Sequence, residues 1–155
     1  MIKILMLTGS LEWSLPERVT HRAGSILTIT FRITNPTTAP RSYQIFMVLF
    51  DPGTGAVIEG TTGRISIDGE DTFEVAAESE LTLVALLKID YTNANMHGSL
   101  YDVQSGEMAI GLQTLLEEPP GVGEQIAPII EFASGVMVLG LVGGMVIDMI
   151  TNKGR

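Results

Sequence analysis

The chain has 155 residues, enough for one domain with an appended segment, and its 18 acidic and 9 basic side chains give a net charge of −9. Nonspecific binding of nucleic acid needs a lysine and arginine surface that displaces counterions from phosphates, and the sequence has no run of basic residues. We therefore expect no nucleic acid among its partners. The sequence contains no cysteine, which excludes a disulfide framework, a zinc–thiolate site and a thiol nucleophile.

The first residues, 1–10, predict a strand. Their longest apolar run is about four residues, whereas the apolar region of a secretory signal peptide needs about 7–15, so no signal peptide is predicted. Next, Leu11, Trp13 and Leu15 alternate with polar residues, which again indicates a strand. Trp13 is the single tryptophan, and we expect it in the core because aromatic side chains mostly contribute buried area.

Residues 25–34 give the clearest strand, because apolar and polar side chains alternate along them and predict a sheet with one polar face. Residues 43–50 are apolar on both faces, which predicts a central strand covered on both sides. The turn residues 51–55 then predict a hairpin to residues 56–58. Further short strands are predicted at residues 63–67, 73–76, 80–90, 99–103 and 107–115, with a loop that begins at residue 93.

About eight or nine short strands at this spacing favour a mainly-β fold, an antiparallel β-sandwich. Their order is glycine, strand and asparagine at the strand end, and later a penultimate strand opened by glycine and followed by tyrosine. This order resembles immunoglobulin-like modules, in particular the cell-adhesion-related (CARDB-like) and fibronectin-III-like sandwiches of bacterial, archaeal and viral surface proteins. The resemblance covers about residues 10–116 and implies a fold for the body, residues 1–116, but no catalytic site. The residues that carry it are 24–35, 43–50, 78–83 and 98–103.

The C-terminal part differs from this body. Residues 117–125 contain paired acids followed by prolines and glycines, and are predicted to form a linker. Residues 126–150 predict one hydrophobic α-helix, because the sixteen residues from Phe132 to Ile147 carry no charge. Such a helix would be about 37 Å long at about 1.5 Å per residue, enough to cross a hydrocarbon core of about 30 Å. Residues 151–155 form a polar tip.

Three arrangements of the predicted helix stay open: a transmembrane anchor, a helix in the core of a multi-subunit fibre or shell, and a helix folded back on its own sandwich. The last fits least, because a surface helix should carry a polar stripe. The spacing of Gly140 and Gly144 matches the small-residue pattern that packs helices in membranes, although a lone glycine-rich span is the alternative. The candidate packing and anchor residues are Gly135, Met137, Gly140, Leu141, Gly143 and Gly144.

Candidate sites for chemistry are few, and no catalytic, cofactor-binding or metal-binding residue is predicted. The two histidines, His21 and His97, lie 76 positions apart and are expected at the surface or in loops. The acidic residues of 68–71, with Asp51 or Asp102, could offer oxygen ligands to Ca²⁺. Their spacing does not match an EF-hand loop, so we expect a solvated acidic turn instead.

Together these features predict a non-enzymatic structural protein, a membrane-anchored or assembly-embedded β-sandwich in a virion or at the cell surface. Its expected partners are the lipid bilayer or sibling subunits, met through the C-terminal helix in a homo-oligomer or larger assembly. One alternative is a membrane-displayed recognition module that binds a partner through sandwich-end loops such as 91–98 or 51–55. Another is a filament subunit whose helix lies in the fibre core.

Overall fold

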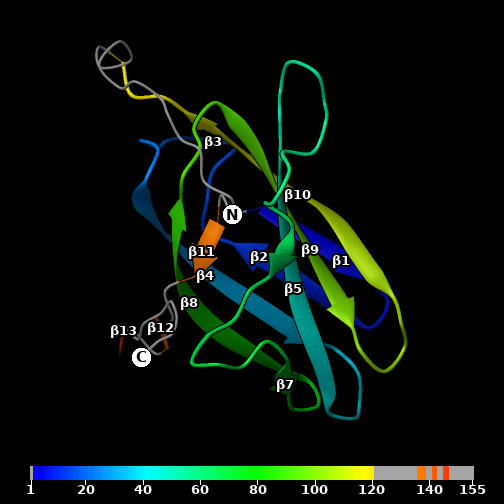
Figure 1. Ribbon diagram of the computed structural model, residues 1–155. Coiled ribbons are helices and arrows are strands. Elements are labelled where there is room, and N and C mark those ends of the chain that lie inside the picture. The colour runs from blue at the N-terminus through cyan, green and yellow to red at the C-terminus, as the bar shows by residue number, and fades with distance from the viewer. Residues whose placement is uncertain (1, 121–135, 139–140, 143–144, 147–155) are drawn as a thin grey trace.

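The computed structural model describes residues 2–120, 136–138, 141–142 and 145–146. Two β-sheets pack face to face in a mainly-β sandwich (Figure 1). The first sheet contains, in order, β1 (Ile2–Met6), β2 (Gly9–Trp13), β4 (Ser25–Asn35) and β8 (Ser79–Ile89). The second contains β3 (Arg18–Thr20), β10 (Met108–Glu117), β9 (Ala94–Asp102), β5 (Arg41–Phe50) and β6 (Gly63–Arg64), and β7 (Phe73–Val75) also pairs with β5.

The centre of the first sheet is the long antiparallel pair of β4 and β8, which is in register from Ser25 opposite Ile89 to Asn35 opposite Ser79. The alternation predicted for residues 25–34 is confirmed, because every second residue from Leu27 to Ile33 is buried and the threonines of β4 face outward. This period of two follows from the pleat of a strand, which sends successive side chains to opposite faces. The inward residues of both sheets form one hydrophobic core.

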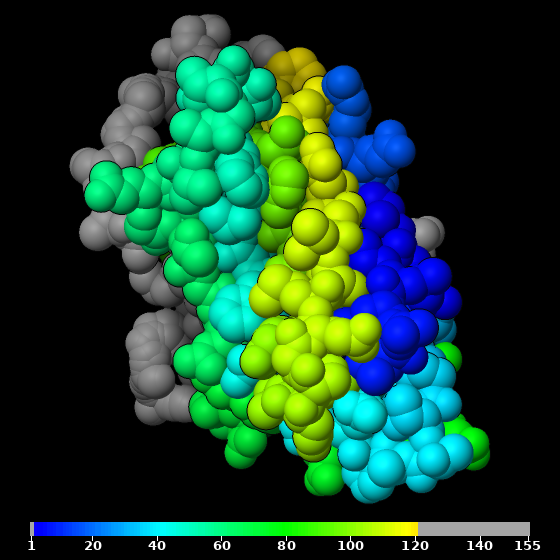
Figure 2. All heavy atoms as spheres, turned by 90° about the vertical axis from the view of Figure 1, so that its right-hand side faces the viewer, coloured from blue at the N-terminus to red at the C-terminus, as the bar shows by residue number. Residues whose placement is uncertain are grey.

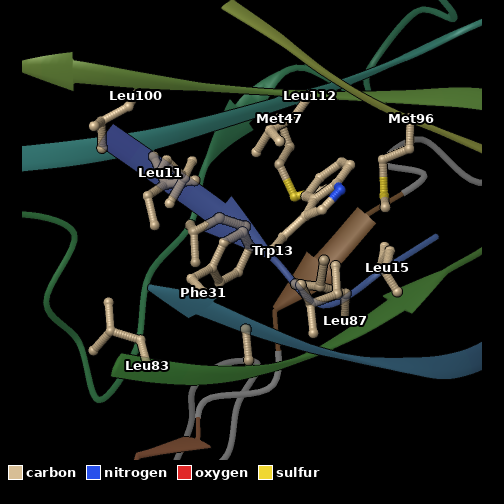
Figure 3. Packing of buried hydrophobic residues seen from close by; sticks show 14 of the residues in the cluster. Leu11, Trp13, Leu15, Phe31, Met47, Leu83, Leu87, Met96, Leu100 and Leu112 are labelled. Atoms are coloured by element: carbon tan, nitrogen blue, oxygen red, sulfur yellow. The ribbon is translucent and has the colours of Figure 1, made fainter. Parts of the chain in front are cut away.

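Trp13 lies in the middle of this core with none of its surface exposed, as predicted. Its ring is tilted against Phe31, with 6.4 Å between the ring centroids, and the side chains of Met47 and Met96 point toward the indole (Figure 3). Gly98 of β9 makes room for it, since a Cβ atom at this glycine would lie 3.0 Å from Cζ3 of Trp13. The indole Nε1 has no hydrogen-bond partner among the described residues.

The prediction that residues 43–50 are covered on both sides is wrong for the described part of the chain. The inward residues of β5 are fully or almost fully buried in the core. The alternate residues, Phe46, Val48 and Phe50, stay partly exposed on the outer face of the second sheet. An apolar side chain on both faces of a strand therefore did not require a third layer within the described residues.

Other strand boundaries differ from the predictions. The three residues of β3 were not predicted; they pair in parallel with Leu115–Glu117 of β10. The expected strand 56–58 is reduced to a single bridge between Val57 and Phe50. The loop expected from residue 93 ends at once, because β9 starts at Ala94 and its backbone pairs with β5 on one side and β10 on the other.

The predicted helix at 126–150 falls mostly outside the described residues, and the part that is described consists of strands. They are β11 (Val136–Val138), β12 (Leu141–Val142) and β13 (Met145–Val146). Strand β11 adds to the first sheet by pairing antiparallel with β8, and β12 pairs with β13. The helix prediction is therefore wrong at these seven positions. All three residues of β11 and β13 other than methionine are valines, whose branched side chains favour strands, and β8 offers β11 an open edge. Within the described ranges, no helix is long and apolar enough to span a membrane.

Candidate functional site

A buried amide organises one end of the sandwich. Asn35, at the end of β4, is fully buried. Its Nδ2 donates to the carbonyl oxygens of Ala39, Val75 and Ala76 at 2.9, 3.0 and 3.1 Å. Its Oδ1 accepts from the backbone N–H and the hydroxyl of Thr37, at 2.9 and 2.7 Å. One side chain thereby ties the turn after β4 to the segment after β7.

An ion pair continues this polar end. Arg41 donates from Nη1 to Oδ2 of Asp102 at 2.8 Å, and from Nε to the hydroxyl of Thr37 at 3.2 Å. The Asp102 side chain is fully buried, and its Oδ1 accepts from the backbone N–H groups of Gln104 and Ser105 at 2.9 and 3.3 Å. A buried carboxylate is tolerated only when such partners replace its lost water.

The same contacts set the charge of Asp102. Burial acts to raise the pKa of Asp102, but hydrogen bonds from the Thr8 hydroxyl and from the two backbone amides act in the other direction and leave the pKa below its usual value. The Thr8 hydroxyl lies 2.8 Å from Oε1 of Glu107, so its single proton is shared between the two carboxylates. Asp102 is thus held ionised by contacts that fix the β9–β10 turn, so these contacts are structural ones.

Tyr43 completes this end of the molecule. It pairs across the sheet with Asp102, and its hydroxyl donates to the Thr8 carbonyl at 2.6 Å. Burial, followed by the nearby charge of Asp102, raises the pKa of Tyr43 to about 12. Gly9 must be small, because a Cβ atom there would lie 2.7 Å from Cε1 of the tyrosine ring. The β1–β2 turn therefore packs against the ring of a neutral tyrosine.

The two histidines lie in different settings. His21 is in a loop, as expected, but it is buried: its Nε2 lies 2.9 Å from the Ile89 carbonyl, and burial lowers its pKa against the opposing effects of that hydrogen bond and of Asp90. Its ring therefore serves as a neutral donor that joins the loop to the end of β8. His97 is half-buried on β9, where its ring lies 4.4 Å from that of Phe50 and burial lowers its pKa.

The candidate acidic ligands are not brought together. In the 68–71 turn, Ile67 and Glu70 form a bridge, and Asp71 lies 3.5 Å from Arg64. Asp102 is taken by Arg41. Across the described part of the chain, no group of three His, Asp or Glu side chains is placed to hold a metal ion.

The two sandwich-end loops of the alternative function have different structures. Most of the 91–98 segment belongs to β9 and forms part of a sheet. The 51–55 turn is exposed, and it closes on itself through hydrogen bonds from Gly53 to the Asp51 side chain at 2.8 Å and from Gly55 to the Asp51 carbonyl at 2.7 Å.

The sequence reasoning did not identify one surface, which we call the apolar face. It is the outer side of β5, β9 and β10, and these strands cross the visible side of the molecule in Figure 2. Phe46 meets Tyr101 edge-on, at 6.2 Å between ring centroids. Ile110 is 73% exposed and stands beside an open hollow of about 350 Å³. The apolar face includes the side chains of Phe46, Phe50, His97, Ser99, Tyr101 and Ile110.

Of the six candidate packing residues, the structure describes the backbone of two. Met137 lies in β11, opposite Lys88, and Leu141 lies in β12, opposite Val146. The four glycines lie outside the described residues: Gly135, Gly140, Gly143 and Gly144.

No protein-family model matches the sequence, and no curated protein does. Among solved structures, 70% of the chain aligns with alkylpurine DNA glycosylase AlkC of Pseudomonas fluorescens, bound to DNA with an abasic-site analogue, at 12% identity and a TM-score of 0.45. The alignment spans 30% of the glycosylase's length. The structural-genomics target SoR45 aligns over 74% of this chain and 87% of its own, at 15% identity and a TM-score of 0.37. Neither structure is described as an immunoglobulin-like or fibronectin-III-like module.

Proposed function

We propose that this protein is a non-enzymatic structural protein, an immunoglobulin-like sandwich held at a membrane or in a multi-subunit assembly by residues 126–150, in a virion or at the cell surface. The observation that carries the proposal is the uncharged run from Phe132 to Ile147, which follows a body whose two sheets enclose a hydrophobic core. Among the described residues, the side chains of this core come from residues 4–116. Lipid or sibling subunits would shelter the apolar run from water.

The strand neighbours support the immunoglobulin-like assignment. In such sandwiches the first, second and fifth strands share one sheet, and the third, sixth and seventh share the other. With β2 taken as the first strand, the short β3 and β6 left out of the count and β7 counted as the fourth, the neighbours β2–β4–β8 and β10–β9–β5 follow this scheme. The parallel pair of β3 and β10 then brings the N-terminal segment to the edge of the second sheet.

The segment 126–150 is proposed to form its helix in lipid. In a bilayer every backbone N–H and C=O must be satisfied within the spanning structure, which a single segment achieves only as a helix. The two-residue strands β12 and β13 and the three-residue β11 provide few hydrogen bonds to give up in exchange. In this proposal Gly140 and Gly144 lie on one side of the helix and permit a second helix to approach closely.

Deletion of residues 121–155 tests the anchor. The full chain should float with liposomes in a density gradient, and the truncated chain should stay at the bottom while keeping the fluorescence of a buried Trp13. Circular dichroism of a peptide covering residues 121–155 should show helix in liposomes. A truncated, folded chain that still floats would show that the body, and not the tail, holds the membrane. Full chain that neither floats nor forms large assemblies would reject the proposal altogether.

A further inference from the structure

We propose that the apolar face is a self-association surface, on which a second copy of this chain docks its own apolar face. This inference goes beyond the proposed function, because the contact uses the second sheet of the body and no residue of the tail. It starts from the distribution of charge. Residues 42–50 of β5, 94–101 of β9 and 108–116 of β10 include no Asp, Glu, Lys or Arg, although the chain has 27 such side chains.

The outer face of the first sheet shows what a solvated face of this protein looks like. Arg32 of β4 forms an ion pair with Glu12 of β2, and Lys88 of β8 donates to Asp90 at 2.9 Å. Thr28 and Thr82 are exposed between these charges. The outer face of the first sheet thus carries ion pairs and hydroxyls beside the exposed Leu5 and Ile26, whereas the central stretches of β5, β9 and β10 carry no charge. A contiguous apolar patch on an otherwise polar protein marks an interaction surface.

Charge favours a second copy as the occupant. Two molecules with a net charge of −9 repel each other over most of their surfaces, but two apolar faces can meet without bringing like charges together. Burial lowers the pKa of His97, so its ring adds no charge to the apolar face at pH 7. The flanks of the face carry both signs, with Arg18 and Glu117 2.6 Å apart beyond β10, and Arg64 and Asp71 3.5 Å apart beyond β5.

Shape gives a second argument. A contact between identical patches must be self-complementary, so each copy needs both a projection and a depression. Ile110 projects from β10, and the hollow beside it is also lined by Phe46, Phe50 and His97. Ile110, Ser99 and Phe46 form one row across the three strands, because Ser99 is in register with both of the others. When a two-fold axis near Ser99 relates the two copies, Ile110 of each copy contacts the opposite half of the apolar face of the other copy.

The area decides how strong the contact is. Three strands of about nine residues, at about 3.3 Å per residue and 4.8 Å between strands, project to about 450 Å². This lies below the about 800 Å² per partner of a standard interface, so we expect a low affinity and few dimers at low protein concentration. The dimer becomes populated when copies are concentrated together, as on a membrane or in a shell.

Single cysteines in the full chain test the contact, because the natural sequence has no cysteine. Ser99→Cys lies at the centre of the apolar face, and Thr82→Cys on the outer face of the first sheet is the matched control. With a short bis-maleimide, purified full-length Ser99→Cys in liposomes should form covalent dimers, whereas Thr82→Cys should form about tenfold fewer. Equal yields at the two positions, or no dimer from Ser99→Cys, would overturn the proposal; the latter is also the result expected if the face serves a different partner.

A second substitution in the same background removes the remaining ambiguity. Ile110→Glu places a charge on a side chain that is 73% exposed, so the fold tolerates it, and the two copies then carry like charges into the contact. Dimer formation by Ser99→Cys should fall about tenfold or more with Ile110→Glu. It should not change with Ile26→Glu, which alters a 51% exposed isoleucine of β4 on the other sheet. Equal effects of the two glutamates would refute the face-to-face contact. Liposome flotation of the same samples reports separately on the tail.

Discussion

Removing the Asn35 side-chain amide should strongly destabilise the sandwich. The amide donates through two N–H groups and accepts two hydrogen bonds from Thr37, in a site with no exposed surface. At about 1 kcal/mol for each of four hydrogen bonds, Asn35→Ala should lower the free energy of unfolding by about 4 kcal/mol. That is a large part of the about 5–15 kcal/mol by which a domain of this size is stable.

Urea unfolding measures the effect, with the fluorescence of the buried Trp13 as the signal. With a slope of about 2 kcal/mol per molar urea, the transition midpoint of Asn35→Ala should fall by about 2 M. Asn95→Ala, at a half-buried asparagine of β9, is the control and should change the free energy of unfolding by no more than about 1 kcal/mol. If Asn35→Ala also stays within about 1 kcal/mol of the wild type, the amide does not hold the turns as argued.

Asn35→Asp separates the loss of hydrogen bonds from the loss of volume. The carboxylate has nearly the same shape but only accepts hydrogen bonds, so it faces the carbonyl oxygens that Nδ2 contacts. Its pKa in the folded state should rise above the unfolded value of about 3.9. The stability of this variant should therefore fall as the pH rises through the interval between those two pKa values. A variant whose stability follows that of the wild type across this pH range would contradict the assignment of Nδ2 as a donor.

Three further predictions follow from the buried groups. The lowered pKa of His21 means that the unfolded chain binds its proton first, so stability should fall as the pH drops from about 6.5 through the folded pKa, and His21→Gln should reduce this dependence in urea titrations. Tyr43→Phe leaves the Thr8 carbonyl without its donor and should cost about 1 kcal/mol in the same assay; an unchanged midpoint would show that water replaces the hydroxyl. Gly98→Ala pushes a methyl group against Trp13 and should cost about 1–3 kcal/mol and shift the tryptophan emission, whereas a silent substitution would mean that the indole moves freely.

The alternation of apolar and polar residues was sufficient to predict the strands of a sheet that has one face exposed to solvent. In β4 every second residue from Leu27 to Ile33 is apolar, and the burial of these residues follows from the pleat. The burial of Trp13 was also predictable, because nothing else in the chain offers as much apolar area. These properties depend on near neighbours in the sequence, and a single sequence displays near neighbours directly.

Properties that depend on distant partners were not predictable. The nine residues of β9 have weak strand character, with Asn95, His97 and Gly98 among them, and only the two neighbouring strands make them a central strand. Gly98 was expected to open a strand, but it lies within β9, where the indole across the core leaves no room for a side chain. The contacts of Asn35 reach residues about 40 positions away, which no local pattern encodes.

The sequence contains the apolar residues of this face, but they were interpreted as evidence for a strand covered within the monomer. Apolar residues on both faces of 43–50 predicted a covered strand, and the described part of the chain provides cover on one side only. The proposed second copy would supply the other side, so the pattern would report an assembly instead of a third layer of the monomer. The outward-facing apolar residues of β5 would then be exposed in the monomer and covered in the assembly.

The two proposed contacts use separate parts of the body, and this has a consequence for assembly. The proposed tail contact uses residues 126–150, whereas the apolar face belongs to β5, β9 and β10 of the second sheet. A copy can therefore engage a neighbour through each contact at the same time. A face-to-face pair closes on itself and stops at two copies, because an isologous contact uses the same patch on both partners. Pairing of tails through Gly140 and Gly144 would link such dimers further, so an extended array requires both contacts. A chain with Ile110→Glu should therefore still bind the membrane but form smaller oligomers.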